Sequence, residues 1–133
     1  MKKFVASFLV LVLALSTVGC SEKSMKFDIG EASKIELRSG TDGTVTEITN
    51  TEDIKHITDN INALTFSRGE SSKDYSGWSY SLKWYNLENN LMEEIVVMSE
   101  QQIDYKGYFY SSMETDHEID LAYFDRLLGE GKR

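Results

Sequence analysis

Proline is absent from this 133-residue chain, and cysteine and histidine are scarce. With one cysteine, Cys20, no disulfide can form within the chain. The two histidines, His56 and His117, give little material for acid–base catalysis or for a metal site. Glycine-rich phosphate loops, calcium-loop spacing and a Gly-x-Ser-x-Gly motif are also missing. We therefore predict no catalytic residues, no metal and no cofactor.

The charge is strongly acidic, at −8 for the whole chain. Two of the 14 basic residues, Lys2 and Lys3, stand at the very start, whereas all 22 Asp and Glu follow Cys20. The chain from Cys20 onward thus has 12 basic residues against 22 acidic ones, a net charge of −10. Such a surface repels nucleic acid and anionic lipid headgroups, so we expect no nucleic-acid partner.

The first 19 residues have the layout of an export signal. Two lysines precede an apolar run, residues 4–15, with a single polar side chain. This run has signal-peptide length and is short for a membrane-spanning helix. The next residues, STVGCS (16–21), resemble the lipobox of bacterial lipoproteins, except that Thr17 stands where that pattern usually has leucine.

The lipobox resemblance implies a defined processing step. In bacterial lipoproteins the cysteine thiol receives diacylglycerol, and a peptidase then cuts before it. Carried over to this chain, Gly19 is the last residue removed and Cys20 bears the fatty acyl (palmitate-type) chains. Two or three such chains hold a protein stably, so we expect a lipid anchor at the extracytoplasmic face of the cell membrane. A chance cysteine after an ordinary signal peptide and an uncleaved anchor are the alternatives.

Four segments follow from this reading. We predict a lipoprotein signal peptide over 1–19, a lipidated tether over 20–33, one globular domain over 34–129 and a tail over 130–133. The tether has little hydrophobic periodicity and many small or charged residues. A domain of about 100 residues can bury a modest core.

Periodicity in the globular part predicts the order β-β-α-β-β-β-α. Alternating residues from Lys34, a turn at Asp42-Gly43 and a β-branched run over 44–49 indicate a hairpin. A helix that either Asn50 or Thr51 can cap follows, with Ile54, Ile57, Ile61 and Leu64 on one face. Residues 67–76 are a polar loop. We then expect strands at 78–85, 91–99 and 103–111 and a helix at 120–128 that stops at Gly129. The fold class is α+β, an antiparallel sheet of about five strands with both helices packed on one face.

The outward face of that sheet carries the candidate binding residues. Alternation along the strands at 78–85 and 103–111 places three tyrosines and two lysines there: Tyr85, Tyr108, Tyr110, Lys83 and Lys106. A tyrosine-rich open face is typical of a surface that binds a protein, a peptide or a cell-wall ligand. Ordinary cross-strand packing of tyrosines, shielded by a loop, explains the same pattern.

Three segments, GWSYSLKWYN (77–86), IDYKGYFY (103–110) and IDLAYFDRLL (119–128), are similar to a group of small, functionally uncharacterised lipoproteins of Gram-positive bacteria such as bacilli. The resemblance implies a cell type and a fold rather than an activity. We expect a non-catalytic binding module of unknown ligand. The alternatives are a cell-envelope hydrolase that uses His56 or His117 and a structural subunit of an envelope complex.

Overall fold

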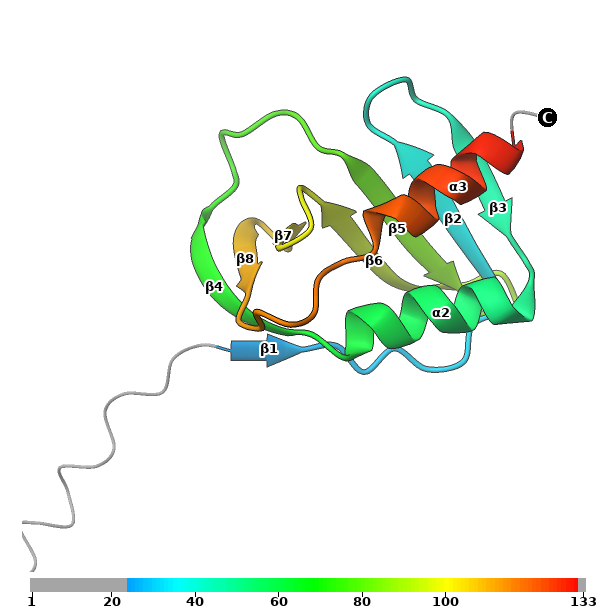
Figure 1. Ribbon diagram of the computed structural model, residues 1–133, viewed down its shortest axis with the longest axis horizontal. Helices are drawn as coiled ribbons and strands as arrows, with labels where there is room; N and C mark the ends of the chain where they lie inside the picture. Colours follow the sequence, from blue (N-terminus) through cyan, green and yellow to red (C-terminus); the bar gives the residue numbers. More distant parts are fainter. Residues whose placement is uncertain (1–23, 132–133) are drawn as a thin grey trace, which may run out of the picture.

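The computed structural model describes residues 24–131 (Figure 1). The expected signal peptide, the cleavage point after Gly19 and the lipidation site at Cys20 lie outside these residues. The described part is an α+β fold with one antiparallel sheet and two helices, as predicted, but the sheet has eight strands instead of about five. No helix in this part is long and apolar enough to cross a membrane.

The elements follow one another along the chain as β1 (Ser24–Lys26), β2 (Lys34–Ser39), β3 (Val45–Ile48), α2 (Thr51–Asn62), β4 (Thr65–Ser71), β5 (Tyr80–Tyr85), β6 (Leu91–Val97), β7 (Gln102–Tyr105), β8 (Tyr108–Ser112) and α3 (Leu121–Gly131). In the sheet the strands lie in the order β1-β4-β8-β7-β6-β5-β2-β3. Every neighbouring pair is antiparallel.

The additional strands have separate causes. β4 is polar except for Phe66, so its sequence reads as a loop, and it is a strand because it pairs with β1 and β8. The segment predicted as one strand over 103–111 is two, β7 and β8. Lys106 and Gly107 both have positive φ, 50° and 88°, and form the tight turn between them.

The segment from Ser24 to Ser33 belongs to the domain, so the predicted tether is wrong over this part. β1 pairs with β4, and Phe27 and Ile29 are buried. The ring centroid of Phe27 lies 4.9 Å from that of Tyr105 and 5.8 Å from that of Phe66. Three apolar residues spaced by two, beginning at Met25, were a weak strand-like signal among charged neighbours.

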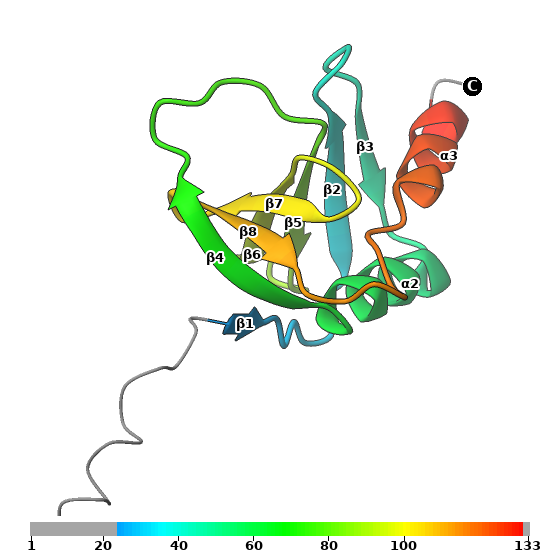
Figure 2. The same ribbon diagram turned by 60° about the vertical axis from the view of Figure 1, so that its left-hand side comes forward.

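Both helices cover the same face of the sheet, as predicted (Figure 2). Trp84 and Tyr80 share this face because they stand four residues apart on β5. The indole Nε1–H of Trp84 donates to Thr58 Oγ1 of α2 at 3.0 Å, and the ring of Tyr80 meets that of Phe124 of α3 at 5.2 Å. The core lies between this face and the helices.

The helix ends depend on local chemistry. Of the two expected cap residues it is Asn50 that caps α2, and its side chain accepts from the Asp53 N–H at 3.0 Å. α3 continues through Gly129, the expected stop, to Gly131 and includes the first residues of the predicted tail. An exposed glycine costs a helix only about 1 kcal/mol, and burial of Leu127 and Leu128 just before it stabilises the helical state.

Candidate binding groove

The predicted tyrosine face is not one surface. Tyr110 pairs with Ile103, and Tyr108 pairs with Tyr105. Directly paired residues point to the same face, so both tyrosines are on the core side and not on the open side. The prediction was wrong for them because the turn at Lys106-Gly107 restarts the alternation. Tyr110 packs against the core as a partly buried residue.

The other members of that set lie apart. Tyr85 and Lys83 do face outward, where Lys34 Nζ lies 4.7 Å from the Tyr85 ring centroid. Lys106 sits in the β7–β8 turn, with Nζ 5.1 Å from the ring centroid of Tyr105. Tyr108 instead contacts Arg68, at 4.8 Å.

A loop shields part of the outward face. Tyr75, in the connection between β4 and β5, packs edge-on against Phe109 with ring centroids 5.3 Å apart. At the start of this loop Ser72 is buried and its hydroxyl donates to Asp104 Oδ1 at 2.6 Å. A covering loop, the alternative to an open binding face, is therefore present over Phe109.

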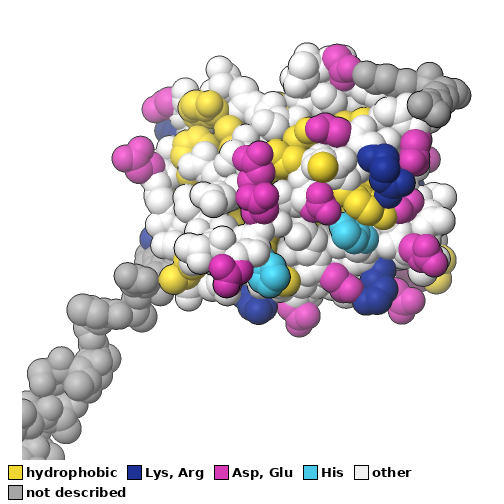
Figure 3. Space-filling model, viewed as in Figure 1, with side chains coloured by type: hydrophobic (Ala, Val, Ile, Leu, Met, Phe, Trp, Pro, Cys, Tyr) yellow, Lys and Arg dark blue, Asp and Glu magenta, His cyan; other side chains and the backbone are white. Residues whose placement is uncertain are grey.

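The two histidines stand at the surface among acidic side chains (Figure 3). His56 of α2 has Nε2 2.9 Å from Asp120 Oδ2, and its ring stacks on Tyr123 of α3 at a centroid distance of 3.9 Å. The Tyr123 hydroxyl donates to Asp53, and Arg126 lies 4.5 Å from the centroid of the Tyr123 ring. We call these five residues the α2–α3 contact.

The α2–α3 contact joins two helices. His117 is exposed in the segment between β8 and α3 and is not one of the five residues of that contact. Within residues 24–131, no group of three or more His, Cys, Asp or Glu side chains is arranged to hold a metal ion.

Perturbed titrating groups also belong to contacts of the fold. Burial, and then the hydrogen bond to Asp125, raise the pKa of Tyr80 to about 12. Burial and the hydrogen bond to Glu93 raise the pKa of Tyr105 to about 12 as well. The backbone N–H of Thr65 lowers the pKa of Glu114. All three side chains lie outside the groove that is described next.

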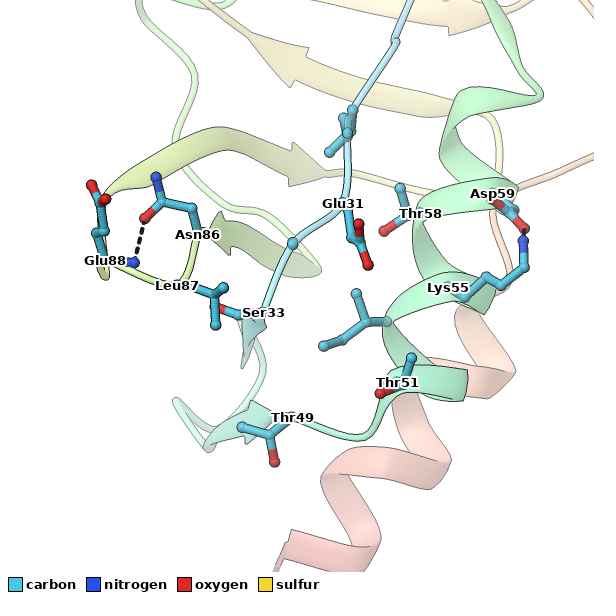
Figure 4. A pocket seen from close by; sticks show the side chains of 14 residues that line it. Glu31, Ser33, Thr49, Thr51, Lys55, Thr58, Asp59, Asn86, Leu87 and Glu88 are labelled. Atoms are coloured by element: carbon cyan, nitrogen blue, oxygen red, sulfur yellow. Dashed lines mark hydrogen bonds and ion pairs between the residues drawn. The ribbon is translucent and has the colours of Figure 1, made fainter.

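An open groove of about 880 Å³ lies beside α2 (Figure 4). One wall is the segment 29–33, the second is α2, and the third is the β5–β6 turn at residues 86–88. Ile29 and Ile54 line it and are nearly buried, whereas Leu87, on the turn, is 92% exposed. The groove therefore has an apolar base and an apolar side chain at its rim.

No family model, curated protein or solved structure matches this chain. The chemistry of the groove has to be taken from its own residues. Hydroxyl groups come from Ser33, Thr49, Thr51 and Thr58. Two of these hydroxyls already make hydrogen bonds within the domain: Thr58 accepts from Trp84, and the Ser33 hydroxyl donates to the Tyr85 carbonyl at 3.3 Å.

Charged groups of the groove are mostly acidic. Glu31, Asp59 and Glu88 line it together with one cation, Lys55. Lys55 Nζ lies 2.5 Å from Asp59 Oδ2, so these two charges neutralise each other. Figure 4 shows the carboxylate of Glu31 directed into the space between its own segment and α2.

The segment 29–33 also offers backbone groups. The side-chain amide of Asn62 bonds both the N–H and the carbonyl of Ile29, each at 3.0 Å, and the Ser33 N–H donates to the Tyr85 carbonyl at 2.9 Å. Between them, the backbone groups of residues 30–32 make no hydrogen bond to any described residue. Unpaired main-chain donors and acceptors therefore border the groove.

Sequence reasoning missed the groove. Its walls come from a predicted tether, a helix N-terminus and a polar turn, which lie far apart in the sequence. One signal was available: Leu87 is the only apolar residue in the turn NLENN (86–90). A large apolar side chain at the tip of a polar turn has no core to join.

Proposed function

We propose that this chain is the precursor of a lipid-anchored extracytoplasmic lipoprotein whose domain is a non-catalytic binding module, with the groove beside α2 as its binding site. The groove carries the proposal. Ligand sites are concave, mainly apolar and equipped with a few polar groups, and volumes of about 300–1,000 Å³ are usual. The groove meets each of these criteria with its apolar base, hydroxyls and unpaired backbone groups.

The proposed anchor is compatible with the position of the domain. Cys20 precedes Ser24, the first residue of β1, by four residues. Four residues span at most about 14 Å, so lipid chains at Cys20 hold β1 close to the bilayer surface. The segment 29–33 begins three residues after the last residue of β1 and forms one wall of the groove. A ligand in the groove would thus be held near the membrane.

The hydrolase alternative has less support in the geometry. Neither His56 nor His117 lines the groove. His56 contacts Asp120 and Tyr123, and within the described residues neither histidine has a serine or threonine hydroxyl as a hydrogen-bond partner. A general base has to reach a nucleophile or a substrate proton within about 3 Å, directly or through one water. A substrate in the groove would have neither histidine on the groove lining to serve as that base.

Two measurements on the full chain, expressed in a bacterium, test the proposal. Mass spectrometry of the membrane-extracted protein should show a polypeptide that begins at Cys20 and carries acyl chains. A Cys20→Ala chain should lose this modification. Finding the unmodified thiol, or a chain that still begins at Met1, would contradict the lipid anchor.

Photo-crosslinking in the same cells tests the binding site. The photoreactive amino acid benzoylphenylalanine replaces Leu87 at the rim of the groove or Tyr75 in the outer loop, which is 59% exposed. We expect a discrete crosslinked product from position 87 and none from position 75. Crosslinks from position 75 alone would move the site to the outer face, and none from either would contradict a binding module.

A further inference from the structure

We propose that the groove binds a peptide segment in which an apolar side chain stands next to a lysine or arginine. This inference rests on the proposed function, because it assigns a ligand class to that same groove. Three features of the groove point to it independently: the apolar base, the unpaired main chain and the charge.

The apolar features fit a side chain of moderate size. Ile29 and Ile54, exposed by only 9% and 7%, present apolar surface at the base, and Leu87 can cover a bound group from the rim because its own side chain touches little else. A volume of about 880 Å³ exceeds one side chain and has room for a segment of a few residues. Burial of a leucine-sized side chain contributes about 1.5–3 kcal/mol at most.

The main chain of residues 30–32 favours a peptide over other apolar ligands. Its N–H and carbonyl groups make no hydrogen bond to any described residue. A peptide backbone offers acceptors and donors for both, and main-chain pairing is a common mode of peptide recognition. Gly30 leaves room for close approach, since a Cβ atom built on it meets no atom within 4 Å.

The charge of the groove selects a basic peptide. With Lys55 paired to Asp59, the carboxylates of Glu31 and Glu88 remain, and the whole chain has a net charge of −8. Within the described residues, the Glu31 carboxylate has no hydrogen-bond or ion-pair partner, and the Glu88 carboxylate accepts only one long hydrogen bond, from the Asn90 side-chain amide at 3.4 Å. These charges attract a cation and repel phosphate, so a phospholipid headgroup is a poor occupant.

Binding of defined peptides to the mature lipoprotein in uncharged detergent tests the inference. The probe is a fluorescein-labelled peptide of alternating leucine and lysine, and its counterpart has glutamate in place of lysine. Fluorescence anisotropy should detect the basic peptide and show at least tenfold weaker binding of the acidic one. Raising the salt concentration should weaken binding of the basic peptide.

Variants separate charge from shape. Glu31→Gln with Glu88→Gln should weaken binding of the basic peptide by about three- to tenfold, which is the usual size of two exposed charge contacts. Glu70→Gln, at an exposed position of β4 outside the groove, is the matched control and should leave peptide binding unchanged. Gly30→Trp should abolish binding by filling the groove. Leu87→Ala, at a side chain too exposed to affect folding, should weaken binding as well.

The outcomes distinguish the two proposals. Equal binding of both peptides, or no effect of the double glutamine variant, would overturn the basic-peptide inference. Binding to phosphatidylglycerol vesicles by the Cys20→Ala chain, lost on Leu87→Ala, would also overturn it in favour of a lipid surface. Crosslinking from position 87 in cells without binding of the basic peptide would leave the binding module standing and remove only the ligand assignment.

Discussion

Helix α2 is used differently on its two flanks. On the flank towards α3, Asp53 and His56 are engaged by Tyr123, Arg126 and Asp120. On the opposite flank, Thr51, Lys55, Thr58 and Asp59 line an open groove. The helical repeat explains the division, because residues three or four apart share a flank.

The two flanks differ in the types of side chain that they carry. Histidine, tyrosine and arginine, which are the residues most suggestive of a reactive site in the sequence, hold one helix to another. The concave surface is lined instead by aliphatic, hydroxyl and charged side chains, with no histidine, tyrosine or arginine among them.

The largest expected effect comes from Trp84, which supports α2 from the sheet. It is fully buried, and its indole N–H donates to Thr58. Trp84→Ala should lower the free energy of unfolding by about 3–5 kcal/mol, measured by urea denaturation. Leu87→Ala, at 92% exposure, is the control and should leave the unfolding free energy unchanged. A loss below about 1 kcal/mol for Trp84→Ala would contradict its place under the helix.

One substitution on each flank tests whether the two flanks of α2 contribute differently to stability. Tyr123→Ala removes the ring stacking on His56, the hydrogen bond to Asp53 and the contact with Arg126. It should cost about 1–2 kcal/mol of unfolding free energy. Lys55→Ala removes an exposed ion pair and should cost under about 0.5 kcal/mol. Equal losses would mean that the groove flank is as structural as the other.

Alkaline pH gives a third test, through the tyrosines that anchor α3 and β6. The pKa values of Tyr80 and Tyr105 are raised to about 12 in the folded protein, above their ordinary value of 10.0. Their contribution is therefore fully present below pH 10 and is lost as the pH rises towards 12. Urea denaturation should show stability falling across this range. The fall should be shallower in Tyr80→Phe, and an unchanged slope would refute the role of its bond to Asp125.

A small stabilising effect is expected from Gly129, on α3. A Cβ atom at this position would meet no atom within 4 Å, and the residue lies inside the helix. Gly129→Ala should raise the unfolding free energy by about 0.5–1 kcal/mol, because alanine loses less backbone entropy in a helix. A small rise in Tm measures this, and a fall would show that α3 ends before this residue in solution.

Sequence patterns predicted the elements that are determined locally. Asn50 with the isoleucine repeat marks α2, and Gly43 has the positive φ expected of the first hairpin turn, at 75°. The strands that depend on distant partners were missed. β4 has one buried apolar side chain, Phe66, and is a strand only because β1 and β8 flank it.

The candidate site was harder to predict for the same reason. Residues 29–33, the start of α2 and the turn at 86–88 each have an ordinary local meaning in the sequence. Their concavity exists only after β2 pairs with β5 and brings Ser33 against Tyr85. The prediction of a tyrosine face was wrong because it missed one turn, Lys106-Gly107, which is a weaker hairpin signal than Asn-Gly or Asp-Gly.

Strand β1 also determines how the domain meets mechanical load. Among the described residues three pairs join it to β4, and the chain then passes directly to Phe27 between Phe66 and Tyr105. Tension on the chain ahead of Ser24 is therefore delivered to an edge strand and next to an aromatic contact, with no slack between them. The domain should yield at that edge before its central strands part, so a pull strong enough to peel β1 would expose Phe66 first.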